Sequence, residues 1–393
     1  MKAVELFAGA GGLALGSARA GFKHDTVVEW NHNACATLRR NQELGHELVA
    51  GWNILEADVS RFDYAKVKGD VTLVAGGPPC QPFSMGGKHR GHRDKRDLFP
   101  EAIRAVRELR PRAVIIENVR GLLREAFSEY LEYILLQLQY PEFVASPGEE
   151  WSNHRTRLER HATKRTHSSG ELTYNVVFQP VNAANFGVPQ IRHRVFFVAF
   201  RSDVDARWAF PSETHSHRAL LRDQWVTGEY WERHKVAKKD RPAPPARVRE
   251  QVARGLFSDD DTSAAPWLTV RDALAGLPDP RAKAARDVPN HVFQAGARTY
   301  AGHTGSPLDE PAKALKAGVH GVPGGENMLA YPDGSVRYFT VRESARVQTF
   351  PDDYVFTGVW SETMRQLGNA VPVSLAEKVA SSVLRTLRRR KQG

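Results

Sequence analysis

Apolar runs alternate with helix-compatible stretches over roughly the first 200 residues of the chain. Strand-like runs occupy residues 3–7, 24–30, 71–75 and 112–116, and the last two are apolar enough to be buried on both faces. A helical stretch extends to Arg19, another follows Asp97, and a third spans residues 130–138. Strands that alternate with helices predict an α/β fold with a doubly wound, mostly parallel sheet.

The pattern changes in the later part of the chain. Residues 174–180 and 193–200 look like two late strands, close enough to pair antiparallel, and residues 146–172 look like a polar surface insertion. Clean alternation is lost over residues 201–341, which are rich in Pro, Gly, Arg and His, and returns near residue 342 with a final helix after Pro372. We therefore predict one domain from residues 1–200 and 342–393, and a smaller irregular domain from residues 201–341.

Composition excludes several classes of protein. The 393 residues are 41 % hydrophobic and carry a formal charge of +10, which suits a globular protein with a polyanionic partner such as nucleic acid. The chain contains no run of 18 apolar residues, so we expect no membrane span. The N-terminal stretch resembles a signal peptide, but Glu5 and several glycines interrupt its apolar run. Cys35 and Cys80 cannot build a disulfide framework, which fits a reducing, cytoplasmic location.

Candidate chemistry lies where the predicted strands end, the edge at which open α/β sheets bind ligands. A turn containing Gly9, Gly11 and Gly12 follows the first strand, and Glu29 comes 20 residues after Gly9, a distance suited to an acid that binds ribose hydroxyls. Trp30 could stack on adenine. These features fit any adenosine cofactor, NAD included, and a tight turn without a ligand stays open.

Two further strand ends carry reactive groups. Cys80 follows Pro79 on a stiff backbone before a basic loop at 88–96, which favours a nucleophilic thiolate, although a lone cysteine is more often inert and buried. Glu117 ends an apolar run, so partial desolvation would let it hold a proton near neutrality; a carboxylate bound to backbone N–H groups is the alternative. Arg192 and Arg194 alternate along a predicted strand, where a solvated face is the simplest interpretation.

Taken together, six segments resemble the DNA (cytosine-5) methyltransferase family, in the family's order. They are Phe7–Gly12, Pro79–Gln81, Glu117–Val119, Gln190–Arg194, Arg342-Glu343 with Arg346, and Gly368–Pro372. The resemblance covers about 1–200 and 342–393, so residues 201–341 fall where this family keeps its target-recognition domain. It implies the fold of S-adenosylmethionine-dependent methyltransferases, with an antiparallel late strand.

The resemblance implies methyl transfer from S-adenosylmethionine to carbon 5 of a cytosine that is flipped out of duplex DNA, without a metal. Cys80 would attack carbon 6, Glu117 would protonate ring N3, and Arg194, with Arg192, would stabilise the carbonyl oxygen. The remaining residues that it implies divide into cofactor contacts and DNA contacts. The cofactor contacts are Phe7, Gly9, Gly11, Gly12, Glu29, Trp30, Asp58, Val59, Pro79, Leu98, Asn369 and Val371. The DNA contacts are Ser84, Lys88, Arg90 and Arg96.

The chain departs from the family pattern in its recognition region. Lys313-Ala314-Leu315 stands where the family often has a Thr-Leu or Thr-Ile pair before a glycine-rich loop, which puts one local DNA contact in doubt. We expect a monomer of restriction–modification type that acts on double-stranded DNA in the prokaryotic cytoplasm, associated with the nucleoid. That type allows a cognate restriction endonuclease that acts separately.

Three alternatives stay open at this point. The same reaction on tRNA is possible within the family, but a long basic region at 201–341 favours a reader of duplex sequence. A catalytically inactive DNA-binding protein would not need Cys80, Glu117 and Arg194 together. An NAD-dependent oxidoreductase would use the glycine turn, but it would leave Cys80 and Asn369 without a role.

Overall fold

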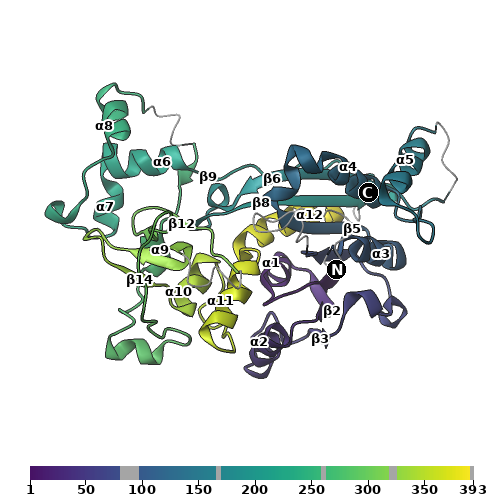
Figure 1. Ribbon diagram of the computed structural model, residues 1–393, viewed down its shortest axis with the longest axis horizontal. Helices are drawn as coiled ribbons and strands as arrows, with labels where there is room; N and C mark the ends of the chain where they lie inside the picture. Colours follow the sequence, from purple (N-terminus) through teal and green to yellow (C-terminus); the bar gives the residue numbers. More distant parts are fainter. Residues whose placement is uncertain (80–96, 165–169, 258–262, 318–324, 390–393) are drawn as a thin grey trace. The chain divides into compact units, whose positions relative to one another are not determined.

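The computed structural model describes residues 1–79, 97–164, 170–257, 263–317 and 325–389 (Figure 1). The chain divides into two compact units, each described by itself below. The first contains residues 1–181, 193–210 and 376–393, and the second contains residues 182–192 and 211–375. Residues 182–192 and 342–375, which the sequence analysis assigns to the larger domain, group with the second unit.

A seven-stranded sheet in the order β3-β2-β1-β4-β5-β8-β6 forms the centre of the first unit. Its strands are β1 (Lys2–Leu6), β2 (Lys23–Glu29), β3 (Asn53–Glu56), β4 (Leu73–Gly76), β5 (Ala113–Val119), β6 (Tyr174–Asn182) and β8 (His193–Arg201). The pairings from β3 through β5 are parallel, whereas β8 runs antiparallel to β5. The prediction of an α/β fold with a mostly parallel sheet and an antiparallel late strand is confirmed.

Helices surround this sheet in Figure 1. They are α1 (Gly12–Ala20), α2 (His32–Glu43), α3 (Phe99–Leu109), α4 (Ser128–Gln139), α5 (Trp151–Ala162) and the later part of α12 (Val373–Arg389). One cluster of buried side chains joins α3, α4 and α5 to β5 and β8. Another joins β1, β2 and β4 to the segment between β3 and β4. Burial of this apolar surface holds the strand ends in fixed register, and the site is built on those ends.

Local sequence explains most of these elements. The sequence predicts Asp97 as the cap of α3, but the N-cap is Leu98, whose side chain makes no capping bond; Asp97, one residue earlier, accepts a hydrogen bond at Oδ1 from the Phe99 N–H (3.2 Å). Gly76 must be glycine because an added Cβ would lie 2.6 Å from the Leu6 carbonyl oxygen on the neighbouring strand. The polar stretch at 146–172 differs from a plain surface insertion: it contains α5, whose His154 and Leu158 are buried.

The second unit consists of short elements. Its strands are β7 (Gln190–Ile191), β9 (His215–Ser216), β10 (Ala265–Pro266), β11 (Ser306–Pro307), β12 (Ala312–Lys313), β13 (Met328–Ala330) and β14 (Val336–Tyr338). Its helices are α6 (His217–Arg222), α7 (Glu229–Arg233), α8 (Ala246–Ala253), α9 (Val270–Leu274), α10 (Val341–Val347), α11 (Trp360–Asn369) and the start of α12. Leu220, Tyr230 and Trp231 form a small buried cluster within it.

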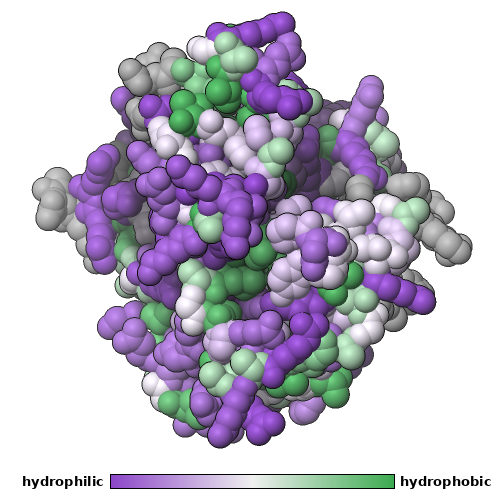
Figure 2. Space-filling view, turned by 90° about the vertical axis from the view of Figure 1, so that its left-hand side faces the viewer, coloured by the Kyte–Doolittle hydropathy of each residue, from purple (hydrophilic) through white to green (hydrophobic). Residues whose placement is uncertain are grey.

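Hydrophilic residues cover most of the face seen in Figure 2, which looks toward the side that carries α6, α7 and α8 in Figure 1. Apolar residues gather there in smaller patches. Among the described residues, no helix combines the length and the apolar character that a membrane span requires.

Candidate active site

The glycine turn after β1 has the open backbone that a bound ligand needs. Phe7, Gly9 and Gly11 all have positive φ angles (55°, 54° and 89°), and α1 begins directly after Gly11. A non-glycine residue with such a φ is strained, and strain of this kind concentrates at functional sites. A Cβ added at Gly9 would meet no atom of the described residues within 4 Å. The turn therefore leaves free space beside the N-terminus of α1.

Glu29, at the end of β2, is tied to this turn. Its Oε2 accepts from the Gly9 N–H (2.7 Å), and its Oε1 accepts from the N–H groups of Trp30 (3.0 Å) and Asn31 (2.8 Å). Burial raises the pKa of Glu29, and the three N–H donors oppose that rise. The carboxylate thus braces the glycine turn.

Trp30 and Asp58 extend the same edge of the sheet. The Trp30 side chain is 75 % exposed, so its indole ring is accessible to a ligand next to Glu29 in the sequence. Asp58, two residues after the end of β3, accepts from the Ser60 hydroxyl (2.8 Å) and the Ser60 N–H (2.9 Å), which lower its pKa. Val59 is buried against the first unit's core. This edge therefore offers an exposed aromatic ring, an acidic side chain at a strand end and an open glycine turn. These are groups that can bind an adenosine ligand.

The turn after β4 packs against Glu117. Sheet register places Gly76 beside Ile116, so Gly77 and Glu117 are the next residues on neighbouring parallel strands. A Cβ at Gly77 would lie 3.2 Å from Glu117 Oε2, so the glycine allows the carboxylate to approach the backbone. The Asn118 side chain donates to the Pro78 carbonyl (3.0 Å). These contacts hold residues 77 and 78, which precede Cys80 in the sequence, beside Glu117 and Asn118.

Glu117 and Arg194 form a close ion pair. Arg194 Nε lies 2.7 Å from Glu117 Oε1, and the two side chains are 16 % and 9 % exposed. The antiparallel register explains the meeting: Phe196 pairs with Glu117, and Arg194 lies two residues along on the same face. Burial lowers the pKa of Arg194, and the charge of Glu117 opposes that shift. The ion pair thus holds the Glu117 and Arg194 side chains together at this edge of the sheet.

Pro79 and Leu98 join the two ends of the segment 80–96. The Leu98 N–H donates to the Pro79 carbonyl (3.2 Å), and the Tyr130 hydroxyl donates to Asp97 beside it. Cys80, Ser84, Lys88, Arg90 and Arg96 lie outside the described residues. Their predicted roles stay predictions.

Arg192 belongs to the second unit and differs sharply from Arg194. It lies between β7 and β8, is fully buried, and donates to the carbonyl groups of Leu315 (3.2 Å), Gly368 (2.6 Å) and Ala370 (3.0 Å). A guanidinium engaged in this way does not support direct contact with a substrate base. The expectation that it shares the carbonyl oxygen with Arg194 finds no support in this geometry.

The other predicted residues of the second unit lie around α10 and α11. Asn369, the last residue of α11, is exposed, and Val371 is buried. Arg342 is fully buried and bonds to three carbonyl groups, while Glu343 pairs with Arg337 (2.6 Å). These residues organise the second unit.

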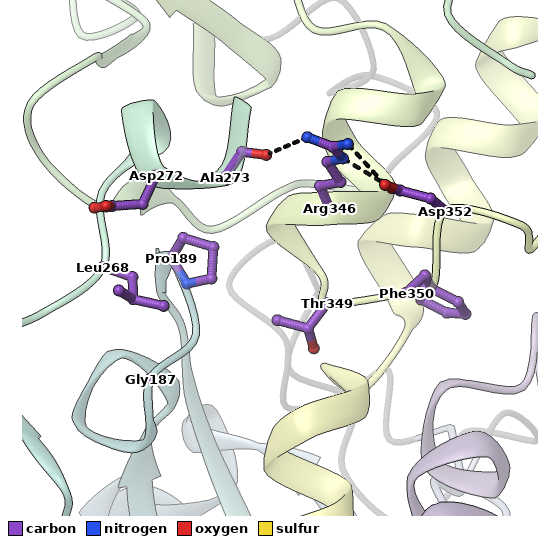
Figure 3. Close-up of a pocket in the computed structure, with 9 residues that line it drawn as sticks. All are labelled: Gly187, Pro189, Leu268, Asp272, Ala273, Arg346, Thr349, Phe350 and Asp352. Carbon is purple, nitrogen blue, oxygen red and sulfur yellow. Dashed lines mark hydrogen bonds and ion pairs between the residues drawn. The ribbon is translucent and has the colours of Figure 1, made fainter. Parts of the chain in front are cut away.

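Arg346 lines a pocket of about 380 Å³ in the same unit (Figure 3). It pairs with Asp352 through two contacts (2.7 and 2.8 Å) and donates to the Ala273 and Ala275 carbonyl groups. Its bonds are thus made to the protein itself, so Arg346 braces α9 against α10.

Sequence reasoning missed the supporting residues Gly77 and Asn118. Asn118 follows Glu117 in the motif Glu117–Val119. Its position in the sequence does not indicate that its side-chain amide donates to the Pro78 carbonyl, which follows β4. In the described part of the chain, no group of three metal-binding side chains occurs.

Comparison with solved structures concerns the fold. The fold resembles a Spodoptera frugiperda DNMT2 mutant (TM-score 0.55, 17 % identity, covering 98 % of this chain and 99 % of that chain). It also resembles the S. pombe Dnmt2 methyltransferase (TM-score 0.52, 18 % identity, full coverage of both chains). At these identities the likeness concerns the fold, which is that of methyltransferases.

Sequence comparison defines the family. The C-5 cytosine-specific DNA methylase family matches residues 1–144 and 152–385. The Type II methyltransferase M.NgoMIV of Neisseria gonorrhoeae is 31 % identical over 390 residues, 98 % of each chain. M.Eco47II of Escherichia coli is 32 % identical over 397 residues, 98 % of this chain and 79 % of that protein. The chain belongs to the C-5 cytosine-specific DNA methylases and is a DNA (cytosine-5) methyltransferase of restriction–modification type.

Proposed function

We propose that this enzyme transfers a methyl group from S-adenosylmethionine to carbon 5 of a cytosine flipped out of a specific duplex sequence, through a transient bond to Cys80. The observation that carries this proposal is the Glu117–Arg194 ion pair (2.7 Å), which lies beside the turn that leads to Cys80. The cytosine ring must gain a proton at N3 and accommodate developing negative charge during the reaction. An acid and a cation held side by side can serve these two needs.

The cofactor would be held at the strand-end edge of the first unit. Glu29 would bind the ribose, Trp30 the adenine face and Asp58 the adenine amino group, with the Gly9–Gly12 turn at the amino-acid portion. Phe7, Val59, Pro79 and Leu98 would supply further contacts, as would Asn369 and Val371 of the second unit. When bound, S-adenosylmethionine supplies an electrophilic methyl group.

Catalysis begins because carbon 5 of cytosine is a poor nucleophile. The Cys80 thiolate adds to carbon 6, and the ring electrons that this bond displaces make carbon 5 electron-rich. Ring N3 gains a proton from Glu117 at this stage. After carbon 5 has accepted the methyl group, a base removes the proton from carbon 5, the Cys80 thiolate leaves and the N3 proton returns to Glu117, which restores the aromatic ring and the acid.

Arg194 has two tasks in this scheme. It positions the Glu117 carboxyl, and its charge would stabilise the base carbonyl oxygen as negative charge develops. We infer that Glu117 gives its proton to N3 only once the base occupies the site.

The DNA partner follows from the family. We infer a monomer that acts on double-stranded DNA in the cytoplasm, close to the nucleoid, with Ser84, Lys88, Arg90 and Arg96 contacting the DNA. A restriction endonuclease would act on the same sequence as a separate protein.

Replacement of Cys80 with Ser tests the covalent step. We expect Cys80→Ser to abolish methyl transfer, because a hydroxyl is a far weaker nucleophile than a thiolate, and to leave duplex binding largely intact. Methyl incorporation would be measured with a labelled donor, and binding by fluorescence anisotropy. A duplex with 5-fluorocytosine should trap the wild-type enzyme covalently but not the variant.

Two controls complete this experiment. Cys35→Ser should keep full activity because Cys35 is buried within α2. A parallel assay on tRNA should show little incorporation. Normal turnover by Cys80→Ser would refute the covalent scheme, and preferential methylation of tRNA would refute the DNA substrate.

A further inference from the structure

Buried polar side chains of the second unit form hydrogen bonds to two separate backbone segments. In the proposed function, one of these segments belongs to the DNA-recognition region and the other contacts the cofactor. We call residues 315–317 the stem, because they precede residues 318–324 of the predicted recognition domain. We call residues 368–370 the turn, because they contain Asn369, a proposed cofactor contact. Arg192 Nη1 donates to Leu315 of the stem, and its Nη2 donates to Gly368 and Ala370 of the turn.

The stem and the turn also touch directly. A Cβ added to Gly368 would lie 2.6 Å from the Ala317 nitrogen and 2.6 Å from the Lys316 carbonyl carbon. Both are backbone atoms, so they cannot rotate away as a flexible side chain would. Gly368 is therefore required by the close approach of the stem.

Three buried side-chain amides also bind the backbone of the stem or of the turn. Gln190 Oε1 accepts from the Leu315 N–H (3.0 Å), and its amide nitrogen donates to Gln348 Oε1 (3.2 Å). Gln348 donates in turn to the Ala370 carbonyl (3.3 Å). Asn327 bonds to both the N–H and the carbonyl of Lys316 (3.1 and 3.3 Å). The network is fully internal, since Gln190, Arg192, Asn327 and Gln348 are all 0 % exposed.

We propose that Arg192 is a positioning residue that couples cofactor binding at the turn to DNA binding through the stem. This inference rests on the proposed function, which assigns the cofactor to Asn369 and the DNA to residues 201–341. When one ligand orders its segment, the shared guanidinium orders the other segment as well. Such coupling is reciprocal: each ligand must tighten the other by the same factor.

The chemistry of the network requires arginine. Its planar fork reaches three carbonyl oxygens at once, whereas a lysine ammonium is a single point that cannot span the stem and the turn together. Arg192→Lys therefore keeps the charge but releases one segment from the other. Gly368→Ala separates the same segments by a different route, because its methyl group pushes the stem away.

The experiment measures coupling directly. Wild-type enzyme is titrated with a duplex that contains the sequence it methylates, with and without S-adenosylhomocysteine, and the ratio of the two dissociation constants is the coupling factor. We expect about tenfold in the wild type, within the usual range for coupled sites, and less than about twofold in Arg192→Lys and Gly368→Ala. The KM for donor and the KM for DNA should rise together.

Arg342→Lys is the matched control. Arg342 is also fully buried in the second unit and bonds to three carbonyl groups, those of Pro289, Pro351 and Tyr354, none of which belongs to the stem or the turn. A general loss of packing would affect both lysine variants, but only Arg192→Lys should lose coupling. Gly51→Ala, where a Cβ meets no described atom within 4 Å, is the control for the glycine.

Hydrogen exchange provides a readout without any variant. In the wild-type protein, S-adenosylhomocysteine alone should slow amide exchange in residues 315–317. The inference is overturned if the wild-type coupling factor is one, if the two variants keep the wild-type factor, or if exchange in the stem does not respond. Failure of the wild-type enzyme to methylate DNA would instead overturn the proposed function.

Discussion

Two arginines two positions apart in the sequence have separate tasks in this enzyme. Arg194 lies on β8 and pairs with Glu117, whereas Arg192 precedes β8 and is enclosed by backbone carbonyl groups. Simple alternation along one strand would put both side chains on the same face. The chain leaves β7 at Ile191 and enters β8 at His193, so the residue between them belongs to neither strand.

Substitution of Glu117 tests its role as an acid. Glutamine keeps the shape of the side chain and can still accept a bond from Arg194, but it has no ionisable proton to give to ring N3. We expect Glu117→Gln to lower kcat by about 10²–10⁴-fold, the usual contribution of a positioned acid. Single-turnover methylation assays would measure the loss.

Binding measurements separate this chemical effect from misfolding. Glu117→Gln should keep its affinity for S-adenosylhomocysteine, since its contacts lie with Arg194 and Gly77. Glu108→Gln is a suitable control, because Glu108 is half-exposed on α3 and pairs with Arg104 of the same helix at 3.2 Å. An unchanged rate in Glu117→Gln would remove the acid role.

Among the elements, α5 shows how a polar sequence can carry a packed helix. Its sequence is rich in Arg and His, yet His154 bonds to the Tyr133 hydroxyl (2.8 Å) and to the Phe143 carbonyl (2.8 Å). Phe143 stacks on His154 and on His161, with ring centroids 5.9 and 4.8 Å apart. Imidazoles here take the place of aliphatic side chains, so hydrophobic periodicity alone could not predict this helix.

The segment before α5 should weaken in acid. Arg157 binds Glu149 through two contacts of 2.7 Å, and this pair lowers the pKa of Glu149 to about 2. Because the folded-state pKa lies below the unfolded value of 4.5, the pair stabilises the fold above about pH 4.5, and this contribution is lost as the pH falls toward 2. Urea unfolding at several pH values between 5.5 and 3.5 would detect the loss.

A double-mutant cycle assigns that pH dependence to the pair. Glu149→Gln and Arg157→Gln should each be less stable than the wild type at pH 5.5, and the double variant should show a coupling energy that shrinks on acidification. A coupling energy that stays constant down to pH 3.5 would contradict the assignment.

For the whole molecule, the charge of +10 sets the response to salt. Basic side chains that neutralise DNA phosphates release counterions, so the association constant should fall steeply as salt rises, by about 10³–10⁵-fold between 50 and 200 mM for six to ten phosphate contacts. Anisotropy titrations over that range would give the slope. Binding of S-adenosylhomocysteine over the same range is the control and should change little. A flat response for DNA would contradict phosphate contacts.

The sequence by itself determined the sheet and the family, and it predicted which groups react. Apolar runs of strand length and helical periodicities are local signals, and they place the glycine turn and Glu29 at strand ends without any knowledge of contacts. The strand predicted to stop before Glu117 continues to Val119, so Glu117 lies within β5. The six motifs in family order predict the chemistry.

Only the tertiary structure decided which partner each of these groups has. The binding of Glu29 to the glycine turn, the pairing of Glu117 with Arg194, and the enclosure of Arg192 depend on atoms up to 178 residues apart in the chain. Such contacts follow from sheet register and from the packing of short irregular segments. Register is fixed by the whole core rather than by local pattern, so the spacing of residues in a sequence carries no direct record of it.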